Sequence, residues 1–383
     1  MSKPDKLKSP ISRRRFLSTA AIAGLAGITG IGLTGCQPKS DASSDLDSSA
    51  NSISNTNSNV VKVYNWTEYI ADSVLKAFTA ETGIEVVYST FDSNEAMYAK
   101  LKLMNNSGDY DVIFPSTDFV DKMRREGMLE TIDHNKLSNF NHLNTAFLDA
   151  DFDPGNQISI PYLWGSSGIA VNTNRLNIND IKSWEDLWRP EFEGRVMLMN
   201  DMRDVFMFAL LTLGLPTTTE DPEHIRQAYQ KLSTLMPNVR TFNSDAPRMP
   251  FMEGETYLGM CWNGEVIMAQ DQGMPELDFV YPEEGVIMWM DNMCIPKNAK
   301  NIDNAHRFID FILRPENSAI ISEEIGYGSP SEAAKKLLPA EIANNPTVYP
   351  PDELLAHALF RSDVSDRTMA LLLQYWDRLK VDM

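Results

Sequence analysis

The chain has 383 residues, of which 43% are hydrophobic and 23% charged, and its formal net charge is −19 at pH 7. A chain of this size is long enough to bury the cores of two lobes. Its acidity argues against nucleic acid as a partner, because the phosphates would be repelled, and mildly favours cationic ligands through long-range steering. Solubility alone would explain the same acidity, and composition does not separate the two interpretations.

Residues 1–35 have the features of an export signal. Lysines and then Arg13, Arg14 and Arg15 precede an apolar run over 16–34 that is rich in Ala, Gly and Ile. Ser-Arg-Arg-Arg-Phe-Leu at 12–17 is similar to a twin-arginine signal, and Leu-Thr-Gly-Cys at 33–36 is similar to a lipobox. We therefore expect lipidation at Cys36 and a membrane-anchored periplasmic protein. An uncleaved anchor is the alternative, because about 20 apolar residues can span a bilayer.

The segment that follows Cys36, up to residue 59, consists almost entirely of Ser, Asn, Asp, Ala and Gln. It is too polar to bury a core, and it predicts a flexible tether between the lipid and a folded domain. The leader carries six basic residues and Asp5, so its removal takes the net charge from −19 to about −24. The mature chain is therefore more acidic than the precursor.

Cysteine and histidine usage predicts little special chemistry. After Cys36 only Cys261 and Cys294 remain, each in an apolar strand-like run, and we expect two buried free thiols. A disulfide is the alternative, which folding in a reducing compartment before export makes less favourable. The five histidines are scattered, so we expect neither a structural metal nor another cofactor.

From residue 60, apolar strand patterns alternate with amphipathic helical patterns. We expect, in chain order, a strand over 60–64, a helix over 73–82, a strand over 85–89, a helix over 93–103 and a strand over 112–114. This alternation predicts a parallel sheet. Ligands of such sheets lie beyond the carboxyl ends of the strands, so residues 66–69 and 115–118 are expected at one crevice.

The rest of the chain predicts a second lobe. We expect an extended segment over 158–172 that passes into it, helices near 184–188 and 205–213, and a return strand near 287–295. The expected fold class is α/β, with two lobes, each a mixed sheet flanked by helices, and a cleft that closes by hinge motion. The expected boundaries are 60–166 plus about 290–335 for the N-lobe, and 167–289 plus about 336–383 for the C-lobe.

Two short stretches, YNWTEY at 64–69 and WMD at 289–291, combine aromatic rings with a carboxylate. A protonated amine gains roughly 0.5 to 2 kcal/mol over an aromatic face, and a carboxylate supplies the counter-charge for a buried ammonium. These stretches therefore indicate a site for organic cations. Isolated tryptophans are more often interior, and we expect packing roles for the remaining four: Trp164, Trp184, Trp188 and Trp376.

The chain from Val60 to Met383 resembles the periplasmic spermidine/putrescine-binding proteins of bacterial polyamine ABC importers, of the spermidine-preferential type. The likeness covers nearly the whole domain. It is carried, in order, by YNWTEY at 64–69, TGIEVVYSTFDSNEAMYAKLK at 82–102, VDKMRREGM at 120–128, PYLWG at 161–165, FNSDAP at 242–247, YLGMCWNG at 257–264, WMD at 289–291 and IGYGSP at 325–330.

This resemblance implies a type II binding fold in which rings enclose a methylene chain and carboxylates hold the ammonium groups. The positions that match the family's ligand contacts are the rings Trp66, Tyr69, Trp262, Trp289 and Tyr327, the polar residues Thr67, Ser116 and Ser244, and the carboxylates Asp201, Asp204 and Asp291. It also implies permease and ATPase partners and a monomer. Without the resemblance, Asp201 and Asp204 would be interpreted as caps of the apolar helix that follows them.

Three positions depart from the family's pattern. Asp204 replaces a glutamate, Asp118 stands where the family has tyrosine, and Arg361 stands where it has glutamine. An arginine facing a polycation costs affinity unless it is neutralised, so we hypothesise an Asp118–Arg361 pair that closes one end of the cleft. Such a pair would shorten the slot and shift preference toward putrescine. In the alternative, the pair lies on the rim and spermidine binds as usual.

Two other functional classes were weighed against a polyamine importer subunit. A sensor-type binding protein for another organic cation, such as a guanidino compound, would use the same fold and pocket. A hydrolase could use paired aspartates as acid and base, but the sequence has no P-loop, HExxH or GxSxG motif. We therefore expect a binding protein and no enzyme.

Overall fold

The computed structural model describes residues 59–104, 108–355 and 358–381, and these belong to one compact unit. The predicted signal peptide, Cys36 and the tether up to residue 58 lie outside the described residues. Within the part of the chain that is described, no helix is long and apolar enough to span a membrane.

A three-stranded parallel sheet forms from the first α/β units, in the strand order β2-β1-β3. Its elements confirm the predicted alternation: β1 Val60–Trp66, α1 Asp72–Thr82, β2 Glu85–Phe91, α2 Asn94–Leu103 and β3 Val112–Ile113. The helix α3 Thr117–Arg125 follows directly. The predicted parallel sheet is therefore present, with the loops after β1 and β3 at the same edge.

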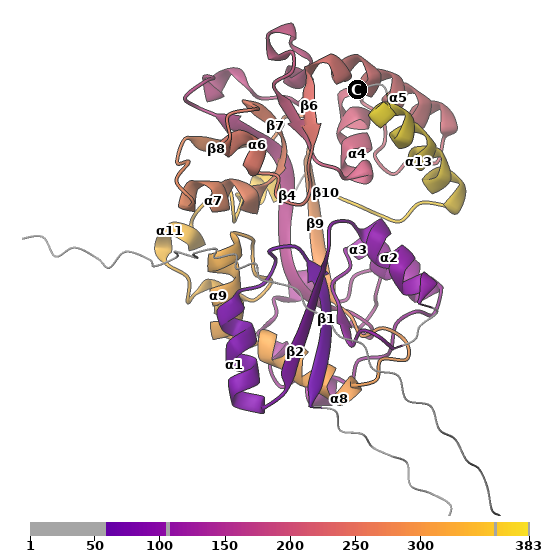
Figure 1. The fold of residues 1–383 in the computed structure, drawn as a ribbon, viewed down its shortest axis with the longest axis vertical. Helices are drawn as coiled ribbons and strands as arrows, with labels where there is room; N and C mark the ends of the chain where they lie inside the picture. The colour runs from indigo at the N-terminus through magenta and orange to yellow at the C-terminus, as the bar shows by residue number, and fades with distance from the viewer. Residues whose placement is uncertain (1–58, 105–107, 356–357, 382–383) are drawn as a thin grey trace, which may run out of the picture. The chain divides into compact units, whose positions relative to one another are not determined.

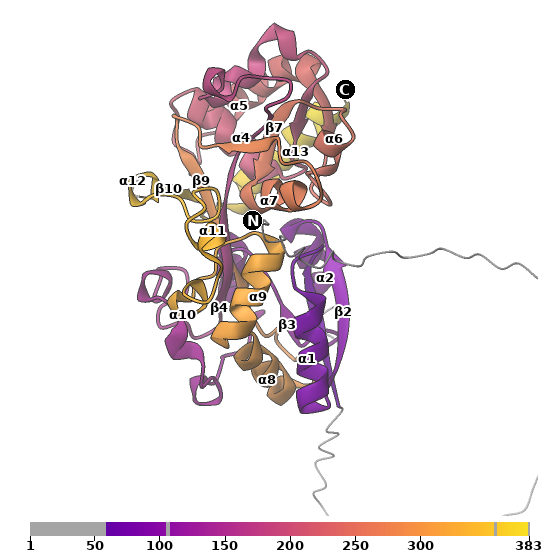
Figure 2. The ribbon, with the colours of Figure 1, turned by 90° about the vertical axis from the view of Figure 1, so that its left-hand side faces the viewer.

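Helices cover both faces of this sheet because its side chains alternate. Val61 and Val63 of β1 pack with α1 and with the later helices α8 Ile302–Ile312 and α9 Pro315–Ile325, which group with α1 in Figure 2. Tyr64 points to the other face, where Met97 of α2 and Met123 of α3 pack against it. The side chains of β1 are thus covered on both faces, whereas those of the edge strand β2 are mostly exposed or half-buried.

Two long strands connect this region to a second sheet. All 13 residues of β4 Ile160–Asn172 and all 8 of β9 Val286–Met293 are buried, and the strands pair antiparallel. Ile160 packs in the core beside β1, whereas Ile169 packs in a separate core built around α4 and α5. These strands confirm the segments predicted to pass between lobes, and Figure 1 shows them running through the middle of the fold.

The second sheet has seven strands in the order β10-β9-β4-β7-β5-β6, with β8 also pairing with β4. It mixes parallel and antiparallel pairs. Its other strands are β5 Val196–Leu198, β6 Val239–Phe242, β7 Leu258–Trp262, β8 Leu277–Val280 and β10 Ala358–Phe360. With the cores on its two sides it forms the second lobe of a two-lobed α/β fold, as expected.

The helices α4 Met202–Thr212, α5 Pro222–Leu235 and α13 Asp366–Val381 pack together beside this sheet (Figure 1). The helices α6 Met249–Met252 and α7 Asn263–Asp271 pack around a smaller core with Cys261. Three further short helices follow α9: α10 Glu332–Lys335, α11 Ala340–Ala343 and α12 Asp352–Leu355.

Details of the packing agree with most of the sequence expectations. Cys261 and Cys294 are free and buried, and burial raises the pKa of both thiols well above the usual value. Trp164, Trp184 and Trp376 are buried. The helix expected at 184–188 is a 3₁₀ helix, Trp184–Trp188, because Pro190 disfavours α-helical geometry at Arg189 and stops it there.

Candidate ligand-binding site

A pocket of about 550 Å³, including space open to solvent, lies where the ends of β1, β7 and β9 meet the loops before α3, α4 and α13. Eleven of the thirteen residues predicted to bind a ligand line it: Trp66, Thr67, Tyr69, Ser116, Asp201, Ser244, Trp262, Trp289, Asp291, Tyr327 and Arg361. The other two, Asp118 and Asp204, lie outside its lining and contact Arg361.

Strands of both sheets position three of the aromatic residues. Trp66 is the last residue of β1, and its indole Nε1 donates a hydrogen bond to the carbonyl of Phe114, 2.9 Å away. Trp262 ends β7 and precedes α7, and Trp289 lies within β9. Gly264 leaves room for the ring of Tyr327, because a Cβ there would lie 2.4 Å from a ring carbon. A close ring contact therefore depends on this glycine.

The rings form a continuous series along the pocket. Adjacent centroids are 6.3 Å apart for Trp66 and Trp262, 6.5 Å for Trp262 and Trp289, 5.0 Å for Trp289 and Tyr327, and 5.5 Å for Tyr327 and Tyr69. All four pairs meet edge to face, which orients each ring by its neighbours. The pocket wall is consequently a set of fixed apolar faces suited to a methylene chain.

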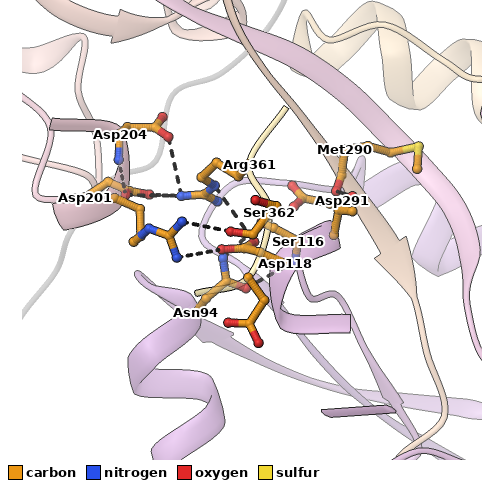
Figure 3. A network of polar contacts seen from close by, with 12 residues as sticks. Asn94, Ser116, Asp118, Asp201, Asp204, Met290, Asp291, Arg361 and Ser362 are labelled. Atoms are coloured by element: carbon orange, nitrogen blue, oxygen red, sulfur yellow. Dashed lines mark hydrogen bonds and ion pairs between the residues drawn. The ribbon is translucent and has the colours of Figure 1, made fainter. Parts of the chain in front are cut away.

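A buried carboxylate lies against this wall. Asp291 is 4% exposed, and the Ser116 hydroxyl donates to its Oδ1 at 2.5 Å. Asn94 holds the serine from behind, since its Nδ2 donates to Ser116 Oγ at 2.9 Å (Figure 3). Burial raises the pKa of Asp291 to about 7, although Ser116, Tyr69 and Arg361 oppose the shift. Without a cationic partner, this acid is close to half-protonated at neutral pH.

The Tyr69 hydroxyl faces the same acid. Burial, and then the charge of Asp291, raise the pKa of Tyr69 well above its usual value, so the phenol stays neutral. The Tyr69 hydroxyl interacts with Asp291 and favours its carboxylate form. The buried indole nitrogen of Trp289 has no hydrogen-bond partner within the described residues and is available to a ligand.

Arg361 is the centre of an ion network beside Asp291 (Figure 3). Its Nη1 lies 2.9 and 3.1 Å from the two carboxylate oxygens of Asp201 and 3.4 Å from Oδ1 of Asp204. Its Nε lies 3.8 Å from Oδ1 of Asp118. These carboxylates keep the pKa of the buried guanidinium well above its usual value against the cost of burial.

The hypothesised contact between Asp118 and Arg361 is present at 3.8 Å. Asp201, the N-cap residue of α4, lies closer, with its Oδ2 2.9 Å from Nη1 of Arg361. Asp201 also caps α4 by accepting from the backbone nitrogen of Asp204 at 3.1 Å, so capping and ion pairing coexist. Asp204 accepts from the Ser167 hydroxyl at 2.5 Å, and burial raises its pKa to about 6.

Sequence reasoning missed four lining residues: Glu68, Phe91, Asp245 and Glu265. Glu68 and Asp245 lie within the segments YNWTEY and FNSDAP, beside residues that were selected, so their positions carried a signal. Glu265 directly follows YLGMCWNG and Arg248 directly follows FNSDAP, but nothing in either segment indicates that these two residues pair. Arg248 Nη1 lies 2.9 Å from Glu265 and Nη2 lies 2.5 Å from Glu68.

Comparison with known proteins agrees with this architecture. A family described as bacterial extracellular solute-binding protein matches residues 73–350. The spermidine/putrescine-binding periplasmic protein of Escherichia coli (strain K12) is 48% identical over 322 residues, which is 84% of this chain and 92% of that protein. Spermidine/putrescine-binding periplasmic protein 1 of Haemophilus influenzae is 43% identical over 348 residues, or 91% of this chain and 95% of that protein.

A solved structure has the same fold. The putative spermidine/putrescine ABC transporter from Listeria monocytogenes superposes with a TM-score of 0.80 at 34% identity, and the match covers 85% of this chain and 100% of that one. The two-lobed fold is therefore that of the periplasmic binding proteins. The chain belongs to the family of bacterial extracellular solute-binding proteins.

Proposed function

We propose that this protein captures polyamines, spermidine or putrescine or both, outside the cytoplasm and delivers them to the permease of an ABC importer. The names of its relatives in E. coli and H. influenzae support this function. The observation that carries it is the series of edge-to-face rings with the buried carboxylate of Asp291 against it. As a member of a solute-binding family, the protein acts by binding and not by catalysis.

The chemistry of the pocket matches an aliphatic amine. Methylene groups gain free energy by leaving water for the ring faces, and an ammonium gains it from the ring quadrupole and from an ionised acid. Micromolar binding requires about 8 kcal/mol. For a triamine of about ten non-hydrogen atoms, this is less than about 1 kcal/mol per atom, which small ligands commonly reach.

Several finer features belong to the same proposal. Cys36 is lipidated and anchors the mature protein to the membrane, and the protein acts as a monomer with permease and ATPase subunits as partners. The lobes comprise 60–166 plus about 290–335 and 167–289 plus about 336–383. Two separate apolar cores, one around β1, α1 and α8 and the other around α4, α5 and α13, support this division.

Binding is tested directly on the purified protein. Native mass spectrometry shows whether it carries an amine from the cell, and calorimetric titration with putrescine, spermidine and a guanidino compound measures each affinity. We expect tight binding of at least one polyamine, recovered chemically unchanged. Failure to bind any diamine or triamine contradicts the proposal.

The transport role needs a test in cells. Deleting the protein is expected to reduce uptake of radiolabelled polyamine, and expression of the intact chain is expected to restore it. Unchanged uptake, together with amine binding in vitro, would assign the protein to sensing instead of import.

A further inference from the structure

Two buried arginines border the pocket in separate places and share no acidic partner. Arg361, in the loop between β10 and α13, contacts carboxylates on α3 and around the start of α4. Arg248, just before α6, contacts Glu68 in the turn after β1 and Glu265 in the first turn of α7. Each guanidinium therefore joins segments that belong to different sheets.

The Arg361 guanidinium separates two cavities. It lines the ring-walled pocket and also an adjoining cavity, on whose wall lie Asp118, Phe147 and Phe152. Of the three acids that contact Arg361, Asp201 lies on the pocket wall. Both of its carboxylate oxygens accept hydrogen bonds from Nη1 of Arg361. Asp118 lies beyond the guanidinium, is 3% exposed, and has no hydrogen bond to either carboxylate oxygen within the described residues. Asp118 lies 4.0 Å from Nη1 of the buried Arg203 as well as 3.8 Å from Nε of Arg361, so its charge is balanced on the side away from the pocket.

The Arg248 guanidinium lies behind a second part of the wall, in contact with the lining residues Glu68 and Glu265. It is 4% exposed and donates to Glu68 at 2.5 Å, to Glu265 at 2.9 Å and to Gln272 at 3.1 Å. Glu68 has a left-handed backbone with φ of 51°, an uncommon conformation for a non-glycine residue. Two acids share one arginine here, so this triad keeps one negative charge, and the half-exposed side chain of Glu68 presents it to the pocket.

Asp291 lies on the wall between these groups. Among the described residues it forms no ion pair with an arginine, and its charge is free for an ammonium. Asp291 and Glu68 are therefore two stations for ammonium groups among the lining acids, which also include Asp245 and Glu265. An ammonium beyond Asp291 would meet the Arg361 guanidinium, which repels it and occupies its space.

We propose that Arg361, on the pocket wall, and Arg248, behind the lining residues Glu68 and Glu265, are built-in cations that limit the slot at its two ends and make it selective for a short diamine over a longer triamine. This inference rests on the proposed function, since it names the preferred member of the polyamine class. Its basis is the pairing of both pocket-facing oxygens of Asp201 with Arg361, the adjoining cavity behind that guanidinium, and the triad around Arg248.

The unmodified protein provides the first test. Calorimetric titration with unbranched terminal diamines of increasing length should show affinity that rises to an optimum and then falls, with putrescine binding at least about tenfold more tightly than spermidine. Fixed end walls require this optimum. Affinity that continues to rise with chain length, or spermidine bound more tightly, overturns the proposal.

Substitutions of Arg361 and Arg248 test whether these two residues limit the slot at its ends. Arg361→Gln removes the charge and opens the pocket toward the cavity at Asp118, so the ratio of spermidine to putrescine affinity should rise at least about tenfold. Arg361→Lys retains the positive charge and should retain the diamine preference. Arg248→Gln should also raise the ratio of spermidine to putrescine affinity, because it removes the charge at the other end of the slot. Arg314→Gln, whose arginine pairs with Glu81 away from the pocket, is the matched control and should leave it unchanged.

The two possible failures are distinguishable. If the unmodified protein binds no amine, the proposed function fails. If it binds amines but the spermidine to putrescine ratio is the same in Arg361→Gln, Arg248→Gln and Arg314→Gln, only the end walls are refuted. Because Arg361→Gln removes the cation that pairs with Asp201 and Asp204 and so destabilises the fold, the chain-length series and Arg361→Lys decide the matter for the folded protein.

Discussion

The ring wall and the arginine networks of the pocket are built in opposite ways. The rings are placed by strand ends and by each other, so their positions follow from apolar packing within the two cores. The networks around Arg361 and Arg248 join side chains from elements far apart in the sequence, and their positions follow from charge pairing in a buried place. The rings supply affinity for any aliphatic chain, and the charges decide how many ammonium groups fit and how far apart.

This difference has an energetic basis. Ring contacts depend little on pH or salt, since they arise from area and quadrupoles. Buried charges depend strongly on their partners, because an unpaired charge costs several kcal/mol in a place that excludes water. Variants of the two regions should therefore differ in size of effect and in dependence on pH and salt.

The largest loss is expected for Asp291→Asn, which keeps the shape of the side chain and removes the charge that receives an ammonium. Removing one partner of a buried charge pair costs roughly 2 to 5 kcal/mol, so putrescine affinity should fall by about 100-fold. Calorimetry measures it, with the exposed Asp377→Asn of α13 as control. Affinity within about threefold of the unmodified protein would remove Asp291 from the ligand site.

A smaller loss is expected from the ring wall. Trp262→Ala removes a half-buried indole between Trp66 and Trp289, and it should cost about 2 kcal/mol, or about 30-fold in affinity, through lost apolar and cation–π contact. Trp262→Phe, which keeps an aromatic ring, should retain part of the affinity that Trp262→Ala loses. The fractional loss should be the same at low and high salt. A strongly salt-dependent loss would show that the indole acts on the charges and not on the chain.

The sequence predicts the fold well where one periodic pattern decides the structure. The alternation from β1 to β3 and the long strand β4 were predictable, because each buries a continuous apolar run. The 3₁₀ helix at Trp184–Trp188 was expected only as a helix, since its pattern is too short to set the type. Element bounds shifted where a cap decides them, as Asp201 does for α4.

The site was less predictable from its own residues. Most of the rings were selected through the resemblance, because a lone tryptophan is equally consistent with packing, as Trp184 shows. The partners of Arg361 and Arg248 depend on how two lobes meet, and no local pattern encodes that. A charge pair such as Arg248–Glu265 leaves no periodic signal, so it was found only in the structure.

The pH response should separate the two regions further. Asp291 has its pKa raised to about 7 by burial, so below that pH it is protonated and attracts an ammonium less. Affinity for putrescine should be highest above pH 7 and fall by up to about tenfold for each pH unit below it. In Asp291→Asn this dependence should shrink to what other buried acids contribute. These are Asp204, whose pKa is raised to about 6, Glu95 in the first turn of α2, whose pKa is raised to about 7, and the pocket-lining Glu265, whose pKa burial also raises.

The ionisation of Asp291 affects the stability of the fold in the direction opposite to its effect on affinity for putrescine. Its pKa in the folded, ligand-free protein lies above the ordinary value of 3.8, so Asp291 stabilises the fold below about pH 4, and this contribution is lost as pH rises through 7. Thermal melts of the free protein from pH 4 to 8 check it against Asp291→Asn. Identical pH profiles for the two proteins would show that Asp291 does not titrate in this range.

The smallest effect is expected at Ser244, which lies on the pocket wall outside both regions. Its hydroxyl oxygen is buried without a hydrogen-bond partner among the described residues, so a bound amine would gain a neutral acceptor there. Ser244→Ala should cost about 1 kcal/mol, roughly fivefold in affinity, with no change in its pH or salt dependence. Ser233→Ala, whose hydroxyl donates to the Tyr229 carbonyl within α5, is the control. A loss of affinity as large as that of Asp291→Asn would mean that Ser244 orients a charged group. Ser244 would then act on binding as a third region beside the ring wall and the arginine networks.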